Sequence, residues 1–356
     1  MSGTSLDGVD AVLLSFDGER PSPRAHVHRP FPGPLRDELL ALNSPGANEI
    51  DRAAQAANAL ARVYADAVTA LLAASGLGAA DIAAIGCHGQ TVRHRPERGY
   101  TAQLVNAALL AELTGIRVVA DFRSRDVAAG GQGAPLAPAF HAAVLGSPAE
   151  DRAILNLGGI ANLTVLRRNS GAEAGFDTGP ASCLMDLWAA RHLGQPFDAG
   201  GAWASGGTVL PELLERLLAE PYFALPPPKS TGRDVFNLEW LARALKGDEA
   251  PPDVQATLLE LTARSVTDAL RKAFPQARRL IACGGGTLNG ALMRRIGALV
   301  APLPLQTTAD FGIDPQQVEA SAFAWLARQA LLGAAGNPPE VTGARGARVL
   351  GAIYPP

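Results

Sequence analysis

Two short glycine-rich segments are the parts of this chain best suited to bind an anion. One is residues 1–8, Met-Ser-Gly-Thr-Ser-Leu-Asp-Gly, which leads into the apolar stretch Val9–Phe16. The other is residues 154–162, Ile-Leu-Asn-Leu-Gly-Gly-Ile-Ala-Asn, which leads into Leu163–Leu166. Small residues let backbone N–H groups and hydroxyls approach a phosphate closely. Each segment is predicted to be a strand–turn–strand hairpin, and the repeat predicts two similar lobes with a nucleotide between them.

Neither of the two common nucleotide-binding motifs occurs in the sequence. The chain has three lysines, and none lies in the GxxxxGK[ST] arrangement of a P-loop. The triple glycine at residues 284–286, followed by Gly290, lacks the G-x-G-x-x-G spacing of the dinucleotide fold. Bound phosphate would therefore have to be held by backbone amides, hydroxyl groups and a metal ion.

Asp177 is the candidate general base. It lies in Gly-Phe-Asp-Thr-Gly-Pro at residues 175–180, and a helix is predicted from Pro180 to about Leu193 with Thr178 as its N-cap. The dipole of that helix would stabilise an ionised carboxylate just ahead of it. Such a carboxylate suits proton abstraction, whereas a structural capping role is the alternative that these residues leave open.

Polar or glycine-rich segments follow two predicted strands. The strand Asp81–Cys87 is followed by His-Gly-Gln-Thr at residues 88–91, and the strand Arg279–Cys283 by Gly-Gly-Gly-Thr-Leu-Asn at residues 284–289. Open α/β sheets bind ligands at the carboxyl ends of strands, and glycines leave room for a flat base or a sugar against the backbone. Both segments are therefore predicted to border a ligand.

Glu319 is a further candidate, in the first turns of a helix predicted from about Pro315 to Leu332. A helix dipole favours a carboxylate at this position. Glu319 is either a ligand contact or only a partner of the dipole.

Helices and strands alternate along the chain, which favours the α/β class. The clearest helical period covers Glu49–Ala74, and a strand is predicted over Ile116–Ala120. Glycines and prolines in Ala128–Pro138 mark the best candidate domain boundary. Further helices are predicted over residues 105–114, 137–145, 208–219, 235–245 and 252–274.

Composition excludes several classes of protein. A length of 356 residues favours two domains, and a net charge of -3 disfavours nucleic acid as the main partner. No apolar run reaches membrane-spanning length, so a soluble cytoplasmic protein without a membrane partner is expected. Cys87, Cys183 and Cys283 lack CxxC spacing, which argues against a disulfide framework and a zinc site. They are interpreted as core residues, with Cys183 as a nucleophile the less favoured reading.

Eight segments, in order over almost the whole chain, resemble the anhydro-N-acetylmuramic acid kinase family. They are Gly-Thr-Ser-Leu-Asp-Gly-Val-Asp at residues 3–10, Cys-His-Gly-Gln-Thr at 87–91, Ala-Asp-Phe-Arg-Ser-Arg-Asp-Val at 120–127, Gly-Gln-Gly-Ala-Pro-Leu at 131–136, Asn-Leu-Gly-Gly-Ile-Ala-Asn at 156–162, Phe-Asp-Thr-Gly-Pro at 176–180, Lys-Ser-Thr-Gly-Arg at 229–233 and Cys-Gly-Gly-Gly at 283–286.

The resemblance implies the two-lobed, ribonuclease H-like fold of the actin, sugar kinase and Hsp70 superfamily, with ATP and Mg²⁺ in an interlobe cleft. We expect residues 1–127 to form the N-terminal lobe and residues 128–334 the C-terminal lobe. Residues 335–356 are expected to form a tail near the interlobe region.

The implied reaction opens the 1,6-anhydro ring with water and phosphorylates O6, giving N-acetylmuramic acid 6-phosphate and ADP during peptidoglycan recycling. The partners are then the amino sugar and ATP, and a homodimer is left open. The resemblance implies Asp177 as the catalytic base and Asp7 near Mg²⁺, through water. The implied ATP contacts are Gly3, Thr4, Ser5, Leu6, Asp7, Gly8, Val9, Asp10, Gly158, Gly159, Gly284, Gly285, Gly286 and Asn289.

Thr91, Arg123 and Glu319 are placed in the sugar site, where the arginine would pair with the lactyl carboxylate or a ring hydroxyl. A structural ion pair of Arg123 with Asp121 or Asp126 is an equally weighted alternative.

The chain departs from the family pattern in three places. The family shows apolar residues ahead of Met-Ser-Gly, so either the start lies upstream or the first phosphate loop lacks its anchoring strand. Ala181-Ser182 replaces Gly-Asn. In Phe-Asp-Ala-Gly-Gly at residues 197–201, Asp198 is retained, but the Asp that the family shows after the intervening Ala199 is lost. A protein that binds nucleotide or sugar without efficient turnover is therefore an alternative. A relative acting on another sugar or on polyphosphate is a weaker one.

Overall fold

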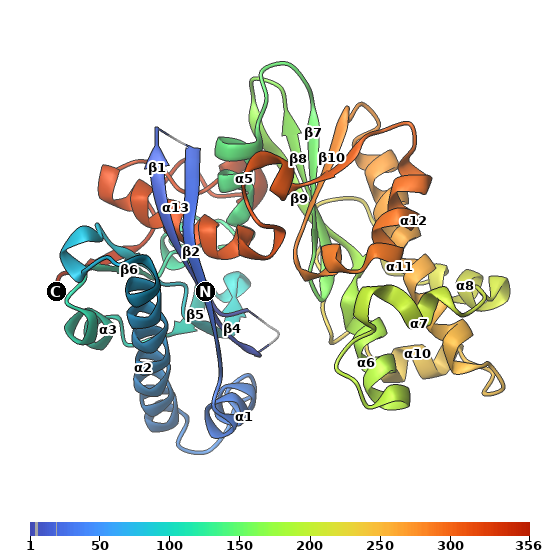
Figure 1. The fold of residues 1–356 in the computed structure, drawn as a ribbon, viewed down its shortest axis with the longest axis horizontal. Coiled ribbons are helices and arrows are strands. Elements are labelled where there is room, and N and C mark those ends of the chain that lie inside the picture. Colours follow the sequence, from blue (N-terminus) through green and yellow to red (C-terminus); the bar gives the residue numbers. More distant parts are fainter. Residues whose placement is uncertain (4–5, 19) are drawn as a thin grey trace. The chain divides into compact units, whose positions relative to one another are not determined.

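The computed structural model describes residues 1–3, 6–18 and 20–356. They form two compact units, the first made of Met1–Val144 with Gln317–Pro356 and the second of Leu145–Gln316 (Figure 1). Helices and strands alternate in both, which confirms the α/β class. No helix in the described part of the chain is long and apolar enough to cross a membrane.

The first unit contains a hairpin and a small mixed sheet. The strand β1 (Gly8–Asp17) pairs antiparallel with β2 (Arg20–Pro30). A second sheet has the order β12-β6-β3. The remaining elements are α1 (Gly33–Ala41), α2 (Glu49–Ser75), β3 (Ile85–Gly86), β4 (Gln90–Arg95), β5 (Tyr100–Leu104), α3 (Ala107–Thr114), β6 (Val118–Ala120), α4 (Ser124–Ala128), α5 (Ala137–Leu145), α13 (Val318–Leu332), α14 (Pro339–Thr342) and β12 (Ala352–Tyr354).

Local sequence explains most of these elements. The helix predicted over residues 49–74 is confirmed as α2, whose buried Leu60, Tyr64 and Leu71 lie on one face. It ends at Gly76, which has a φ of 71° that suits glycine. The strand predicted over residues 81–87 is confirmed only at Ile85–Gly86.

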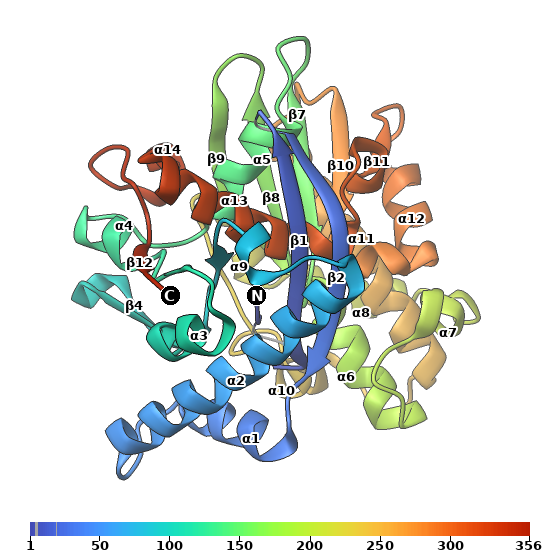
Figure 2. The same ribbon diagram turned by 60° about the vertical axis from the view of Figure 1, so that its left-hand side comes forward.

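The helix α13 packs against β3, β1 and β6, so it belongs to the first unit (Figure 2). The approach to β3 is close, because a Cβ on Gly86 would lie 2.2 Å from the carbonyl oxygen of Phe323. Residues 128–144 and 317–334, which were expected in the C-terminal lobe, are thus part of the first unit. Sequence order does not show that α13 returns to β3, since only tertiary packing brings them together.

The second unit has one five-stranded sheet of order β11-β10-β7-β8-β9. The strands are β7 (Arg152–Leu157), β8 (Ile160–Arg167), β9 (Gly171–Pro180), β10 (Arg279–Cys283) and β11 (Leu305–Thr307). Its helices are α6 (Ser182–Leu193), α7 (Ala202–Ser205), α8 (Pro211–Leu218), α9 (Pro221–Ala224), α10 (Leu238–Ala244), α11 (Pro251–Ala273) and α12 (Gly290–Val300). The largely buried α11 packs on β8 and β9 and forms the centre of the core with the surrounding helices.

The three cysteines are buried and form no disulfide, which confirms their interpretation as core residues. Burial raises the pKa of the Cys183 thiol to about 11. A thiol with so high a pKa is a poor nucleophile near neutral pH.

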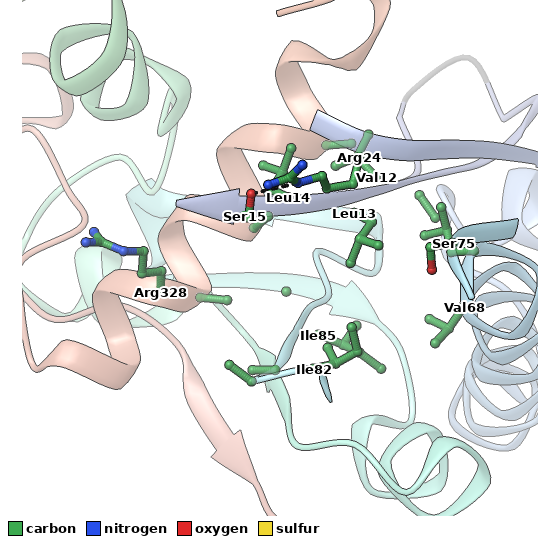
Figure 3. Close-up of a pocket in the computed structure, with 18 of the residues that line it drawn as sticks. Val12, Leu13, Leu14, Ser15, Arg24, Val68, Ser75, Ile82, Ile85 and Arg328 are labelled. Atoms are coloured by element: carbon green, nitrogen blue, oxygen red, sulfur yellow. Dashed lines mark hydrogen bonds between the residues drawn. The ribbon is translucent and has the colours of Figure 1, made fainter. Parts of the chain in front are cut away.

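An apolar groove of about 950 Å³ crosses the first unit between β1, α2, α13 and residues 81–86. Figure 3 shows Val12 and Leu13 of β1, Val68 of α2, and Ile82 and Ile85 around it. Met1 also lines the groove and pairs with β1 there. Its ammonium donates to the Asp10 carbonyl at 2.7 Å, and the Asp10 N–H donates to the Met1 carbonyl at 2.9 Å. Burial lowers the pKa of this ammonium.

Residues joined to the Met1 nitrogen are expected to continue this pairing along β1 and fill the groove. Five alternating apolar residues added there should raise Tm by at least about 2–4 °C, the shift that 1 kcal/mol of added stability gives in domains of 150–250 residues. The control is an extension of equal length with two prolines, which cannot complete the backbone ladder. Equal Tm values for both extended chains and the original chain would contradict this expectation.

Asp126 fastens the C-terminal segment of the first unit to the loop after α4. Its carboxylate, which has no solvent exposure, accepts hydrogen bonds from the Gly133 N–H at 2.7 Å, the Asn337 amide at 2.7 Å and the Thr342 hydroxyl at 2.8 Å. Arg123 donates instead to His88 and to the Gly133 carbonyl. The hydrogen bonds of Asp126 therefore serve the structure of this loop.

Replacing Asp126 by alanine is expected to lower the free energy of unfolding by about 3 kcal/mol or more. Three buried donors would lose their acceptor, and an unsatisfied buried group costs about 1–3 kcal/mol. Urea denaturation measures the loss, with the exposed Asp66→Ala as the matched control. A loss below about 0.5 kcal/mol, typical of surface substitutions, would contradict this role.

Candidate functional site

The turn between β7 and β8 confirms the second predicted hairpin. The carbonyl oxygens of Gly158 and Gly159 accept hydrogen bonds from the N–H groups of residues 181–183, at the start of α6. A Cβ on Gly158 would meet only the Ile160 carbonyl oxygen, at 3.5 Å. Hydrogen bonds from the start of α6 therefore hold the turn in place, and the absence of side chains on its glycines leaves space beside their backbone. Because its contacts with residues 181 and 182 use backbone N–H groups, the Ala181-Ser182 departure preserves them.

The triple glycine packs directly against this hairpin. A Cβ on Gly284 would lie 2.5 Å from Asn156 Oδ1, and one on Gly286 would lie 2.7 Å from Leu157 Cβ. Gly285 is exposed, and a Cβ there would have no atom within 4 Å. The structure thus brings residues 158–159 and 284–286 to one end of the sheet. Such exposed glycine backbone can lie flat against a nucleotide.

Two other polar residues near this end have structural partners. Asn289 Oδ1 accepts from the Leu292 N–H at 3.0 Å, which makes Asn289 the N-cap of α12. Asp198 accepts from the N–H groups of Trp203 and Ala204, both at 2.9 Å. Both side chains therefore order short segments of the second unit.

Asp177 lies in β9, which corrects the predicted position just ahead of a helix. The strand continues to Pro180, and α6 begins at Ser182 with Ala181 as an N-cap that makes no side-chain cap. Thr178 is not the N-cap, and its hydroxyl donates to the Ala161 carbonyl at 3.3 Å. The strand pairing shifts beside Asp177, because Asn162 pairs with Asp177 and Ala161 with Gly179. A bulge of this kind redirects a side chain at the end of a strand.

Three hydrogen bonds fix Asp177. Its Oδ2 accepts from the Thr231 N–H at 3.0 Å, and its own N–H donates to the Lys229 carbonyl at 3.1 Å. The Tyr222 hydroxyl donates to the Asp177 carbonyl at 2.7 Å. Burial raises the pKa of the Asp177 carboxyl to about 6, against the opposing effect of the Thr231 N–H. Near neutral pH the side chain is thus an ionised but readily protonated base.

Arg233 follows on the same loop and was not singled out as a site residue from sequence. Its guanidinium lies near the hairpin turn, where a Cβ on Gly159 would lie 3.6 Å from Nη2. Its positive charge lowers the pKa of the Asp186 carboxyl, which burial raises more strongly. The loop 229–233 therefore joins the carboxylate of Asp177 and a cation beside the glycine turn. The signal in sequence was the Lys-Ser-Thr-Gly-Arg motif itself.

The first glycine-rich segment lies in the other unit, and Thr4 and Ser5 fall outside the described residues. The Leu6 N–H donates to the Gly3 carbonyl at 3.4 Å, just ahead of β1. Of the predicted hairpin, the described residues form the strand β1, and Met1 pairs with its residue Asp10. The Leu6 and Val9 side chains are buried in the core, so only their backbone can serve a ligand.

Two carboxylates, those of Asp7 and Asp10, lie at the start of β1. Asp7 is exposed, and Gly8 is buried with its α-carbon close to the Arg29 backbone. Asp10 accepts from His28 Nδ1 at 3.0 Å and contacts His26 Nε2 at 3.2 Å. These β2 histidines were not foreseen from sequence.

The predicted sugar contacts also lie in the first unit. Arg123 donates through Nε to His88 at 3.1 Å and through Nη1 to the Gly133 carbonyl at 2.7 Å. Burial lowers its pKa to about 10, although the charges of Glu319 and Asp126 act to raise it. Glu319 is exposed on the first turn of α13, and Thr91 Oγ1 on β4 accepts from the Gln103 amide at 3.2 Å. The structure thus brings Arg123 and Glu319 close enough for their charges to interact.

Comparison with known proteins covers the whole chain. The family pattern described as anhydro-N-acetylmuramic acid kinase matches residues 1–356. The chain is 57% identical over 363 aligned positions to an anhydro-N-acetylmuramic acid kinase of Cupriavidus pinatubonensis, covering 100% of this chain and 97% of the relative. It is 58% identical over 360 positions to the protein of the same name in Bordetella pertussis, covering 100% of this chain and 94% of the relative.

A solved structure, the ADPNP-bound activator of the 2-hydroxyisocaproyl-CoA dehydratase from Clostridium difficile, aligns at 15% identity with a TM-score of 0.41. That alignment covers 74% of this chain and 79% of the other. The sequence matches, in contrast, extend over the full length of the chain. The chain therefore belongs to the anhydro-N-acetylmuramic acid kinase family.

Proposed function

We propose that the protein uses ATP and water to convert 1,6-anhydro-N-acetylmuramic acid into N-acetylmuramic acid 6-phosphate and ADP, in the cytoplasmic recycling of peptidoglycan. The observation that carries the proposal is the fixed, partly buried Asp177 carboxylate. Its Oδ2 is engaged by Thr231, and the described residues form no hydrogen bond to its Oδ1. One carboxylate oxygen is thus held in place while the other can take up a proton.

In the proposed reaction Asp177 serves as the general base for water. The water oxygen forms a bond to C1 of the sugar as its proton passes to Asp177, and the bond between C1 and the bridging oxygen breaks. That oxygen stays on C6 with its electron pair and attacks the γ-phosphorus of ATP. The bond to ADP then breaks, and Asp177 releases its proton to solvent. Hydrolysis of the ring thereby supplies the nucleophile for phosphoryl transfer.

The second unit supplies groups that fit the phosphates of ATP. Phosphoryl transfer depends mainly on positioning and charge stabilisation. The glycine turn at residues 158–159 is open at the backbone, and Arg233 adds a cation beside it. Gly284, Gly285 and Gly286 are proposed to border the adenosine. The hydrogen bonds between Asp177 and the loop that carries Arg233 would keep the base at a fixed position relative to the phosphate site.

The carboxylates of the first unit could hold a Mg²⁺ ion that keeps most of its water ligands. The described residues contain no cluster of three or more His, Cys, Asp or Glu side chains that could hold a metal ion. Mg²⁺ is commonly bound by one or two carboxylates together with substrate phosphates. Asp7 and Asp10 are therefore proposed to hold it, Asp7 through water, with the backbone of Gly3 and Gly8 near the phosphates. When bound, the ion would neutralise charge on the phosphates.

The sugar is proposed to bind Thr91, Arg123 and Glu319. Arg123 is a suitable partner for the lactyl carboxylate, because a guanidinium binds carboxylates through paired N–H groups. The hydroxyl of Thr91 and the carboxylate of Glu319 supply complementary groups for sugar hydroxyls.

Replacing Asp177 by asparagine is expected to lower kcat by at least about 10²–10⁴-fold, the usual contribution of a positioned general base. The assay follows ADP release from ATP, Mg²⁺ and 1,6-anhydro-N-acetylmuramic acid, and identifies the sugar product by mass. Wild type should give one ring-opened, phosphorylated product. The exposed Asp268→Asn is the matched control and should retain wild-type activity. Equal rates in the Asp177→Asn variant and wild type would show that Asp177 is not the base.

The pH profile should report the raised pKa of Asp177. The base must be unprotonated, so kcat/KM is expected to fall about tenfold per pH unit below pH 6 and to level off above it. With an unperturbed aspartate, kcat/KM would instead begin to fall only near pH 4. Initial rates between pH 4.5 and 8, with stability checked at each pH, distinguish the two. A fall of kcat/KM that begins only near pH 4 would mean that Asp177 is solvated in the free enzyme.

A further inference from the structure

His88 lies at the carboxyl end of β3 and has only 5% of its surface exposed. Its ring contacts Phe323, Gly89 and Arg123. The ring packs against the tilted ring of Phe323 in α13 at a centroid distance of 4.5 Å, and its Nδ1 lies 2.8 Å from the Gly89 carbonyl oxygen. On the other side, Nε2 lies 3.1 Å from Nε of Arg123. The ring therefore has a defined contact on each nitrogen and on its face.

These contacts determine which nitrogen carries the proton. A carbonyl oxygen can only accept a hydrogen bond, so Nδ1 must donate to Gly89. The Arg123 Nε–H can only donate, so Nε2 must accept. His88 is therefore neutral. Burial, with the nearby charge of Arg123, lowers its pKa well below the usual range and is consistent with this state.

The contact with His88 fixes the orientation of the Arg123 guanidinium. Nε donates to His88 and Nη1 donates to the Gly133 carbonyl, so two hydrogen bonds from different nitrogens hold the group in one orientation. A guanidinium has five N–H donors, and the three that form no hydrogen bond to the described residues remain for a ligand. Phe323, which supports the His88 ring, lies four residues after Glu319 on α13. Residues four apart lie on the same face of a helix, so the turn with Glu319 also faces this arrangement.

We propose that His88 is a positioning residue that aims Arg123 at an anionic group of the sugar substrate without placing a further negative charge against the guanidinium. The inference rests on the proposed function for the identity of that sugar. A carboxylate at position 88 would hold the guanidinium equally well but would neutralise it. A neutral acceptor fixes the direction of Arg123 without competing for its charge. A neutral histidine at position 88 therefore favours a substrate that carries a carboxylate.

The test compares two sugars that differ only in this group: 1,6-anhydro-N-acetylmuramic acid and 1,6-anhydro-N-acetylglucosamine, which lacks the lactyl carboxylate. For His88→Leu, kcat/KM for the first sugar should fall about 10–100-fold, as expected for a lost charged hydrogen bond. Activity on the second sugar and KM for ATP should change less than about threefold. His88→Gln keeps an acceptor and should recover part of the preference for the acid.

His141→Leu is the control for loss of a buried histidine in the same unit. It should leave the ratio of the two kcat/KM values unchanged. A parallel fall for both sugars in His88→Leu, or no fall, would overturn the proposal.

An assay without substrate separates this proposal from the proposed function and applies even if the variants fail to fold. In ¹⁵N NMR spectra of the wild-type protein, His88 should show a protonated Nδ1 and an unprotonated Nε2 between pH 6 and 8. A proton on Nε2 would overturn the proposal. If wild type phosphorylates neither sugar, the proposed function fails, whereas the nitrogen shifts still decide whether His88 accepts from Arg123.

Discussion

The hydrogen bonds between Asp177 and the loop of residues 229–231 are the constraint on which the proposed chemistry depends. The backbone of Asp177 pairs with Lys229, and its side chain accepts from Thr231. Burial keeps the proton affinity of the carboxylate high, while the Thr231 N–H stabilises the ionised form. These opposing effects place the pKa near 6, where a group can both accept and release a proton at neutral pH. Without the loop, burial alone would favour the neutral acid.

Backbone geometry matters as much as side chains at this site. The bulge in β9 lets Asp177 leave the regular alternation of the strand, and the close packing of Gly284 and Gly286 on β7 requires the absence of side chains. In the first unit, Gly86 has the same role beneath α13. Glycine positions thus set how closely the elements that carry polar residues can approach one another.

Sequence patterns predicted the parts of the fold that depend on local order. Apolar runs located β10 and the β7–β8 hairpin, and helical periodicity located α2. The position of Asp177 was wrong, because Pro180 followed by a helical pattern favoured an earlier helix start, whereas pairing with β8 extends the strand to that proline. The partners of Asp177 and Arg123 could not be predicted, since they are far away in sequence. His88 was visible only as part of a motif, and its role follows from contacts with Arg123 and Phe323.

The proposed reaction requires that the oxygen released from C1 is the same atom that receives the phosphoryl group. The most direct measurement uses 1,6-anhydro-N-acetylmuramic acid labelled with ¹⁸O at the bridging position, followed by ³¹P NMR of the product. In this reaction the label is expected to bridge C6 and phosphorus and to shift the phosphorus resonance of the sugar phosphate. An unshifted resonance, with the label found at C1, would contradict it.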